Sequence, residues 1–228
     1  LRTPLTSISG NASNLISNGN QFDEETKMQL YTDIYDDSMW LINLVENLLA
    51  VTRIEEGKIN LRISPELIDE VINEALHHVN RLSKQHTIRV HMPEEMLFAK
   101  MDARLIIQVI INIVDNAIKY TPTGSVIDII AKRKDEDIVV RIADNGEGIT
   151  DEVKLHIFDM FYTGAQKVAD SRRSLGLGLS LCQSIIHAHG GNINVSDNIP
   201  KGAVFTFTLK AFKPELEEAL LVGGMQDE

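Results

Sequence analysis

A long helical pattern from Glu24 to Glu56 is the feature that most limits what this chain can fold into. Asp23 is a typical helix N-cap, and Gly57 is a typical residue just past a helix end. Apolar residues recur between them at spacings of mostly three and four, at Leu30, Ile34, Leu41, Leu44, Leu48 and Val51, with Asp37 as the exception, and Tyr31, Ile42, Val45 and Leu49 widen the stripe. A stripe this wide needs more than one neighbouring helix to cover it.

The residues before this stretch predict a second helix that pairs with the first. Thr3 to Asn18 is a helical candidate, with Pro4 acceptable near its start, and residues 17–20 have the composition of a loop. Two copies of such a hairpin bury their apolar faces economically as a four-helix bundle, so we expect a homodimer. The alternative is that the hairpin packs on the remainder of the same chain.

After Gly57 the pattern changes to a mixture of strands and helices. We expect strands at 58–63, 87–92, 97–101, 125–132, 138–143, 192–195 and 203–210, and helices at about 65–80, 102–120 and 177–189. Asp102 is the expected N-cap of the second of these helices, and the stretch from 144 to 174 is expected to be rich in loops. These elements lack a regular βαβ rhythm, which favours an α+β sandwich with its helices on one face of the sheet. The chain therefore divides into a helical hairpin (1–57), an α+β domain (58–213) and an acidic tail (214–228).

Composition excludes several classes of protein. The formal net charge of −11 disfavours nucleic acid as a partner, and no apolar run is long enough to cross a bilayer. A single cysteine, Cys182, excludes a disulfide framework and a Cys-rich zinc site, and it fits a reducing cytoplasm. The sequence starts at Leu1 without an initiator Met or a signal-peptide pattern, so we expect a cytoplasmic piece of a longer protein, with any membrane attachment in the missing upstream part.

The predicted helix at 102–120 ends in polar residues that an ordinary apolar helix does not need. Asn112 and Asn116 are one turn apart on one face, with Lys119 and Tyr120 close by. Amide oxygens suit a hard cation such as Mg²⁺, Lys119 could neutralise phosphate charge, and Tyr120 offers a flat surface to a base. The alternative is a helix that simply exposes polar residues at its end.

Two glycine-containing segments suggest close contact with a ligand. Residues 144–149 (Asp-Asn-Gly-Glu-Gly-Ile) follow a predicted strand, where a carboxylate could accept from the amino group of adenine. Residues 175–179 (Leu-Gly-Leu-Gly-Leu) open a predicted helix, whose backbone amides favour an anion such as a polyphosphate. Each segment also has a plain interpretation, a turn for the first and a tightly packed helix start for the second.

In this order and spacing, the segments resemble the catalytic portion of the sensor histidine kinases of two-component systems. Residues 1–5 (Leu-Arg-Thr-Pro-Leu) match the end of the family's H box, 112–122 its N box, 144–149 its G1 box, 158–162 its F box and 176–179 its G2 box. Residues 44–57 further resemble the potassium-responsive KdpD subfamily. The resemblance implies a dimerisation and histidine-phosphotransfer hairpin followed by an ATP-binding domain of the GHKL type, which shares its fold with gyrase B, Hsp90 and MutL.

The resemblance also assigns residues to a site for ATP and Mg²⁺. Asn116 would bind Mg²⁺ with Asn112 in support, Asp144 would bind the adenine amino group, and 164–174 would form a mobile lid above Phe158 and Phe161. The residues implied at the nucleotide are Asn112, Asn116, Lys119, Tyr120, Asp144, Gly146, Gly148, Ile149, Phe161, Arg172, Arg173, Leu175, Gly176, Leu177, Gly178 and Leu179.

Two positions depart from the family pattern. The phosphoacceptor histidine would lie immediately before Leu1, and none of the seven histidines present has an H-box context. Ser174 stands where the family has the first glycine of its G2 run. Thr3 occupies the position that helps to remove phosphate from the response regulator, which makes regulator dephosphorylation a second expected activity.

The expected function is therefore ATP-dependent autophosphorylation of a histidine, followed by transfer to an aspartate in the receiver domain of a response regulator. One alternative is a dimeric nucleotide-binding scaffold without phosphotransfer. The other, an ATPase of the chaperone or mismatch-repair type, is disfavoured by the H-box remnant and the long helical hairpin.

Overall fold

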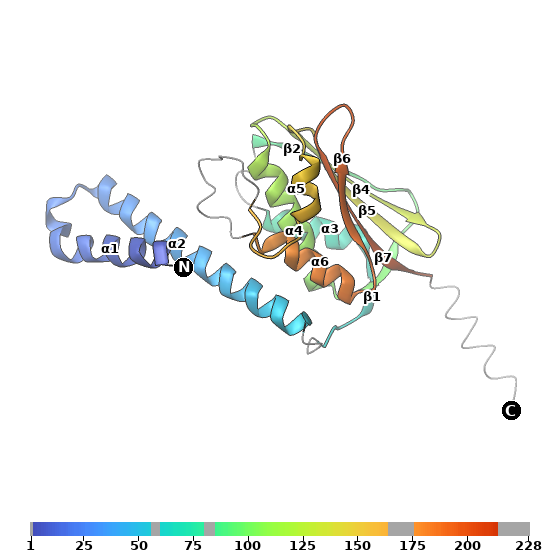
Figure 1. Cartoon of the computed structure of the whole chain (residues 1–228), viewed down its shortest axis with the longest axis horizontal. Coiled ribbons are helices and arrows are strands. Elements are labelled where there is room, and N and C mark those ends of the chain that lie inside the picture. The colour runs from blue at the N-terminus through green and yellow to red at the C-terminus, as the bar shows by residue number, and fades with distance from the viewer. Residues whose placement is uncertain (1, 56–59, 80–84, 164–175, 214–228) are drawn as a thin grey trace, which may run out of the picture.

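The computed structural model describes residues 2–55, 60–79, 85–163 and 176–213. The chain begins with the predicted hairpin, made of α1 (Arg2–Asn18), a 3₁₀ turn η1 (Gly19–Gln21) and α2 (Glu24–Glu55). Asp23 caps α2 as expected, because its Oδ1 accepts the Thr26 amide at 2.7 Å. Figure 1 shows this hairpin extending to one side of the remaining fold.

A seven-stranded sheet forms the centre of the second part of the chain. Its strands are β1 (Ser64–Leu67), β2 (Thr87–His91), β3 (Phe98–Met101), β4 (Val126–Lys134), β5 (Asp137–Asp144), β6 (Ile193–Asp197) and β7 (Ala203–Phe212). The order is β1-β3-β7-β5-β4-β2, with β6 paired to β7, and only the β2–β4 pairing is parallel. The predicted β4–β5 hairpin is confirmed, with Lys134 opposite Asp137.

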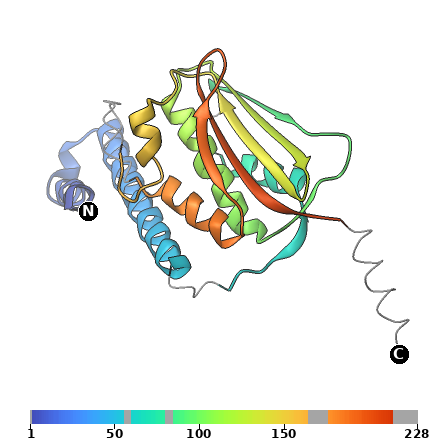
Figure 2. The ribbon, with the colours of Figure 1, turned by 45° about the vertical axis from the view of Figure 1, so that its right-hand side comes forward.

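Helices α3 (Ile68–His78), α4 (Ala103–Tyr120) and α6 (Gly178–Ala188) pack on one face of this sheet, as Figure 2 shows. Their inward side chains and alternate residues of β4, β5 and β7 form one core, in which Ile110, Ile129 and Phe207 are fully buried. The expected α+β sandwich with helices on one face is confirmed. A short helix, α5 (Asp151–His156), lies at the edge of this layer.

Two sequence-based assignments between residues 58 and 68 are wrong. The expected strand at 58–63 is absent from its described part, since residues 60–63 are irregular. Pro65, expected to open a helix, lies inside β1, and α3 starts only at Ile68. β1 is an edge strand, where the missing amide of proline is tolerated. The structure also places α5 in a stretch expected to be loop; its six residues are too few for a clear helical period.

Asp102 precedes α4 as predicted, but its side chain does not cap the helix. Its carboxylate instead accepts the Arg62 amide (3.1 Å) and the Arg104 guanidinium (3.0 Å), while its own amide donates to His189 Nε2 (3.0 Å). Burial opposes ionisation of this carboxyl, but the Arg104 guanidinium and the Arg62 amide outweigh it and hold its pKa below the usual value. This network joins the segment after α2 to the ends of α4 and α6.

Part of the apolar stripe of α2 is covered by the same chain, because α2 lies against α6. Leu44 is buried there, whereas Tyr31, Ile42, Val45, Leu48 and Leu49 remain exposed. The described helices include none that is both long and apolar enough to span a bilayer.

Candidate functional site

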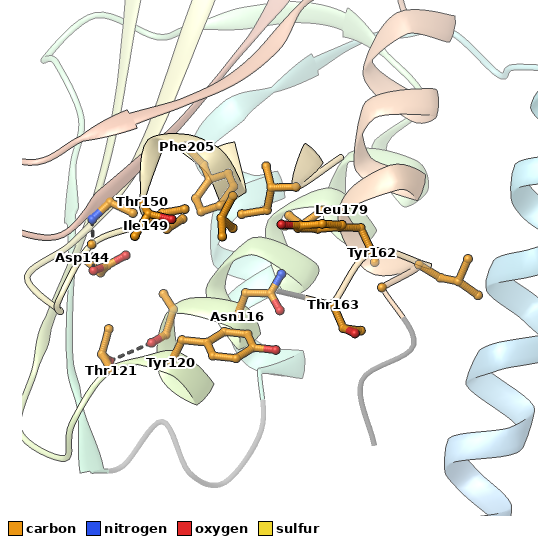
Figure 3. Close-up of a pocket in the computed structure, with 18 of the residues that line it drawn as sticks. Asn116, Tyr120, Thr121, Asp144, Ile149, Thr150, Tyr162, Thr163, Leu179 and Phe205 are labelled. Carbon is orange, nitrogen blue, oxygen red and sulfur yellow. Dashed lines mark hydrogen bonds between the residues drawn. The ribbon is translucent and has the colours of Figure 1, made fainter. Parts of the chain in front are cut away.

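A cavity of about 400 Å³ lies between α4, the start of α6, the loop after β5, and α2. Figure 3 shows Asn116 and Tyr120 on one side of it, Asp144 and Ile149 at one end, and Leu179 at the other. Of the residues predicted for the nucleotide site, those that line the cavity are Asn116, Tyr120, Asp144, Gly148, Ile149, Gly176, Leu177, Gly178 and Leu179. Segments from three separate parts of the sequence therefore meet at one place.

Asp144, at the end of β5, is the buried carboxylate of this cavity, with only 8% of its surface exposed. Its Oδ1 accepts the amides of Gly146 (2.8 Å) and Ala203 (3.2 Å). Among the described residues nothing donates to Oδ2, so this oxygen is available to a donor inside the cavity. A buried acceptor gains most from a partner that matches it, because an unpaired one is costly.

The last turns of α4 supply the polar side of the cavity. Asn116 and Tyr120 line it, one turn apart. Asn112 does not line it; its Nδ2 donates to the carbonyl of Gly178 at 3.4 Å, so it contacts the start of α6. Lys119 is also outside the lining, with its Nζ 5.4 Å from the centre of the Tyr120 ring.

The start of α6 supplies backbone amides. Gly176 has φ +65°, and a Cβ there would overlap the backbone of Tyr162. Glycine at 176 therefore lets the chain before α6 pass directly against the segment after α5. The Gly176 carbonyl accepts the Phe161 amide there, at 3.1 Å. The first amides of α6, from Gly178 onward, lie beside the cavity and lack partners within the helix, which suits an anion.

Other predicted residues lie elsewhere. Gly146 is next to the cavity rather than lining it, and Phe161 is 59% exposed, whereas Phe158 packs edge-on against Phe205. Thr3 is exposed on α1 and does not line the cavity. Arg172, Arg173, Leu175 and the expected lid at 164–174 lie outside the described residues.

Sequence reasoning missed a wall of the cavity. Trp40, Leu44 and Asn47 of α2 line it, together with other residues to which no role in the site was assigned, which are Thr121, Glu147, Thr150, Val153, Ile157, Tyr162, Thr163, Ala203 and Phe205. Thr121, Glu147 and Tyr162 lie inside the matched segments 112–122, 144–149 and 158–162, so assigning a role to every residue of those segments would have found them. No local pattern marks the α2 residues, whose position depends on how the hairpin packs.

This donor set fits a nucleotide better than a metal held by protein alone. The described residues contain no group of three His, Cys, Asp or Glu side chains placed to hold a metal ion. A cation here would need oxygens from its ligand in addition to the Asn116 amide, which is how Mg²⁺ binds with polyphosphates. One end of the cavity offers a carboxylate to an amino group, and the other offers helix amides to an anion.

Two known domain families match the chain. Residues 1–57 match the His Kinase A (phospho-acceptor) domain, and residues 101–213 match the histidine kinase-, DNA gyrase B- and HSP90-like ATPase domain. The sensor protein KdpD of Clostridium acetobutylicum is 44% identical over 92% of this chain, and KdpD of Escherichia coli is 32% identical over 96%. The chain spans 23% and 24% of the length of these relatives.

Solved structures of histidine kinases resemble the fold of this chain. The histidine kinase AdeS of Acinetobacter baumannii superposes with a TM-score of 0.74 at 25% identity, covering 93% of this chain and 98% of that one. The histidine kinase ThkA, solved in complex with the response regulator protein TrrA, has a TM-score of 0.67 at 27% identity and covers 94% of this chain and 59% of its own.

Proposed function

The chain belongs to the sensor histidine kinases of two-component systems, and from this premise we propose that it is the catalytic core of a KdpD-like sensor. In this proposal the γ-phosphoryl group of ATP passes to a histidine immediately before Leu1, and then to an aspartate of a response regulator. The ATP-binding domain positions the phosphates, since phosphoryl transfer chiefly requires positioning and stabilisation of charge.

The observation that carries the proposal is the placement of Asp144. Its Oδ1 is held by two backbone amides, no described residue donates to Oδ2, and Asp144 lines a cavity that a nucleotide could enter. We assign Oδ2 as the acceptor for the amino group of adenine. Ile149 and Phe205, which line the same cavity, would pack against the apolar faces of the base.

The opposite end is assigned to the phosphates. Gly176, Gly178 and Leu179 would offer backbone amides to them, and Leu177, which is 3% exposed, fixes the start of α6 in the core. Asn112 touches Gly178 and would support this turn from behind rather than bind the nucleotide directly. Lys119, Arg172 and Arg173 would supply positive charge to the phosphates.

We propose that the nucleotide binds with Mg²⁺. The Asn116 amide fits as a single protein ligand, and Mg²⁺ would supply neutralisation of the phosphate charge. The chain's own part is to orient that amide: α4 is buried along Ile110, Ile113 and Val114, which fixes the rotation of the helix about its axis.

The hairpin is assigned to dimerisation and to the partner. Exposed apolar residues on α2, including Ile42, Val45 and Leu49, would be covered by a second copy in a four-helix bundle. The response regulator would dock on this hairpin, and Thr3 would serve regulator dephosphorylation. We also propose domains at 1–57 and 58–213, with a tail at 214–228.

The test is transfer of label from γ-labelled Mg²⁺–ATP to a chain extended upstream through the expected histidine. Acid-labile, base-stable label on the protein supports the proposal, and the Asp144→Asn variant of that chain should lose it. If the wild type binds ADP but the protein takes up no label, the chain is a nucleotide-binding scaffold without phosphotransfer. Absence of both label and ADP binding would contradict the site itself.

A further inference from the structure

His86 lies outside every segment that the proposed function uses, yet it contacts the cavity wall. Its Nε2 is 3.1 Å from the hydroxyl oxygen of Thr121, a cavity-lining residue. The Thr121 hydroxyl already donates its only hydrogen to the carbonyl of Ala117, at 2.7 Å. His86 must therefore donate to Thr121, which places the ring hydrogen on Nε2.

The position of the His86 ring is fixed by the segments on either side of it. The carbonyl of Gln85 accepts the Gly124 amide at 2.7 Å, and the Thr87 amide donates to the carbonyl of Ser125 at 2.9 Å. These bonds join residues 85–87 to the loop that follows Thr121. His86 is thus held in reach of Thr121 by backbone contacts that do not involve the cavity.

The two hydrogen bonds of the Thr121 hydroxyl fix its rotamer, and with it the direction of its methyl group. That methyl lies against Gly146: a Cβ on Gly146 would be 2.7 Å from Thr121 Cγ2 and 3.0 Å from Asp144 Oδ1. The Thr121 methyl and the Asp144 carboxylate therefore share the small space above Gly146, at the end of the cavity assigned to the base.

The second ring nitrogen of His86 argues against a role in stability alone. Nδ1 is buried and has no hydrogen-bond partner within the described part of the chain. A buried unpaired acceptor destabilises a fold, so an apolar side chain of similar size would suit this position if packing were its only purpose.

We propose that His86 is a positioning residue for the nucleotide: by holding Thr121 in one rotamer, it shapes the base end of the cavity beside Asp144. The inference rests on the nucleotide function proposed above. It predicts that the hydrogen-bond donor at position 86, rather than the bulk of the ring, controls affinity for adenine nucleotides.

The test measures ADP affinity by calorimetry in His86→Leu, His86→Gln, Thr121→Val and the His86→Leu/Thr121→Val double variant. Leucine keeps the volume without a donor, whereas glutamine places an amide donor close to the position of Nε2. We expect His86→Leu to weaken ADP binding roughly 3- to 10-fold, the size of one neutral hydrogen bond. His86→Gln should restore it, and His86→Leu should have no further effect when Thr121 is already valine.

Several outcomes would overturn the inference. Unchanged affinity in His86→Leu, or an equal loss in the presence and absence of the Thr121 hydroxyl, would show that His86 does not act through Thr121. If His86→Leu does not fold, His86→Asn replaces it, since its shorter amide mimics Nδ1 and should fail where glutamine succeeds. A wild type that binds no ADP contradicts the proposed function as well, whereas a binding wild type with an unaffected His86→Leu contradicts only this inference.

Discussion

The Asp144 carboxylate and the Ala203 backbone amide are 59 residues apart in the sequence, yet they form a 3.2 Å hydrogen bond at the base end of the cavity. The turn that precedes Ala203, between β6 and β7, provides Asn198, whose side-chain amide donates to the carbonyl of Asp144 at 2.7 Å. A Cβ on Gly202 would overlap that carbonyl, so only glycine permits the approach. Two strand ends thus fix the direction of one carboxylate before any ligand arrives.

Replacing Asp144 by Asn should weaken nucleotide binding with little loss of structure. An asparagine oxygen can still accept from Gly146 and Ala203, but its NH₂ group then meets the amino group of adenine, donor against donor. We expect ADP affinity to fall about 10- to 100-fold by calorimetry, corresponding to about 1–3 kcal/mol for a buried unpaired group. Asp128→Asn, on β4 beside His91, is the matched control; equal losses in both variants would contradict the assignment.

Gly146→Ala should disturb the base end, and Thr121→Ser should relieve part of the effect. The added methyl would lie 2.7 Å from Thr121 Cγ2, an overpacking that costs about 1–3 kcal/mol. Serine at 121 removes that methyl and keeps the hydroxyl. ADP affinity and thermal unfolding of the single and double variants measure this, and purely additive losses would show that the two side chains do not meet.

Trp40 should report nucleotide binding directly, because it is the only tryptophan and it lines the cavity. We expect saturating ADP to change the intensity or emission maximum of its fluorescence, with the same midpoint as calorimetry. The Trp40→Phe variant is the control for fluorescence changes that do not come from Trp40. If the protein binds ADP without a change in Trp40 fluorescence, α2 does not lie against the cavity in solution.

Asp102 should contribute to stability in a pH-dependent way. The pKa of Asp102 is lower in the folded chain than in the unfolded chain, so the unfolded chain binds more protons in acid. The contribution of Asp102 to stability is therefore lost as the pH falls through the folded pKa, below about pH 4. We expect Asp102→Asn to reduce the free energy of unfolding at pH 7 by about 1–3 kcal/mol, through loss of charge-assisted hydrogen bonds. Urea unfolding from pH 7 to pH 3 should show the difference in free energy of unfolding between the two proteins becoming smaller. A difference that does not depend on pH, or one as large in Asp69→Asn at the half-buried start of α3, would contradict this.

Cys182 should be unreactive in the folded protein. Burial raises the pKa of its thiol to about 12, so hardly any thiolate exists at pH 8. A disulfide reagent such as 5,5′-dithiobis(2-nitrobenzoate) should label no thiol natively and one per chain in urea, since the sequence has one cysteine. Rapid labelling of the native protein would show that α6 separates from α4 more readily than its packing indicates.

The sequence predicted those parts of the fold that local pattern determines. The helical period of α2, the Asp23 cap, the β4–β5 hairpin and α6 follow from residues close together in the chain. Pro65 misled the prediction, because proline is acceptable both at a helix start and in an edge strand, and only the pairing of β1 with β3 decides between them.

The candidate site was predictable where its residues sit in recognisable segments, and not where they come from tertiary contacts. Asn116, Asp144 and Gly178 meet at one cavity although no local rule required it. The wall formed by Trp40 and Leu44, and the support that His86 gives to Thr121, arise between segments far apart in the sequence. Asn112, which the resemblance assigns to the nucleotide and in support of Mg²⁺, lies one helical turn before Asn116; it does not line the cavity, and its Nδ2 donates to the Gly178 carbonyl.

Because Trp40, Leu44 and Asn47 of α2 belong to the cavity wall, the hairpin and the ligand share a surface. A molecule that fills the cavity with α2 in place must bind with a different affinity once α2 has rotated or moved away. By thermodynamic linkage the effect works in both directions. A rotation of the hairpin changes the affinity of the cavity for its ligand, and binding of the ligand shifts the equilibrium between hairpin positions by the same free energy. A signal that moves α2 therefore acts on the site directly, without an intermediate element.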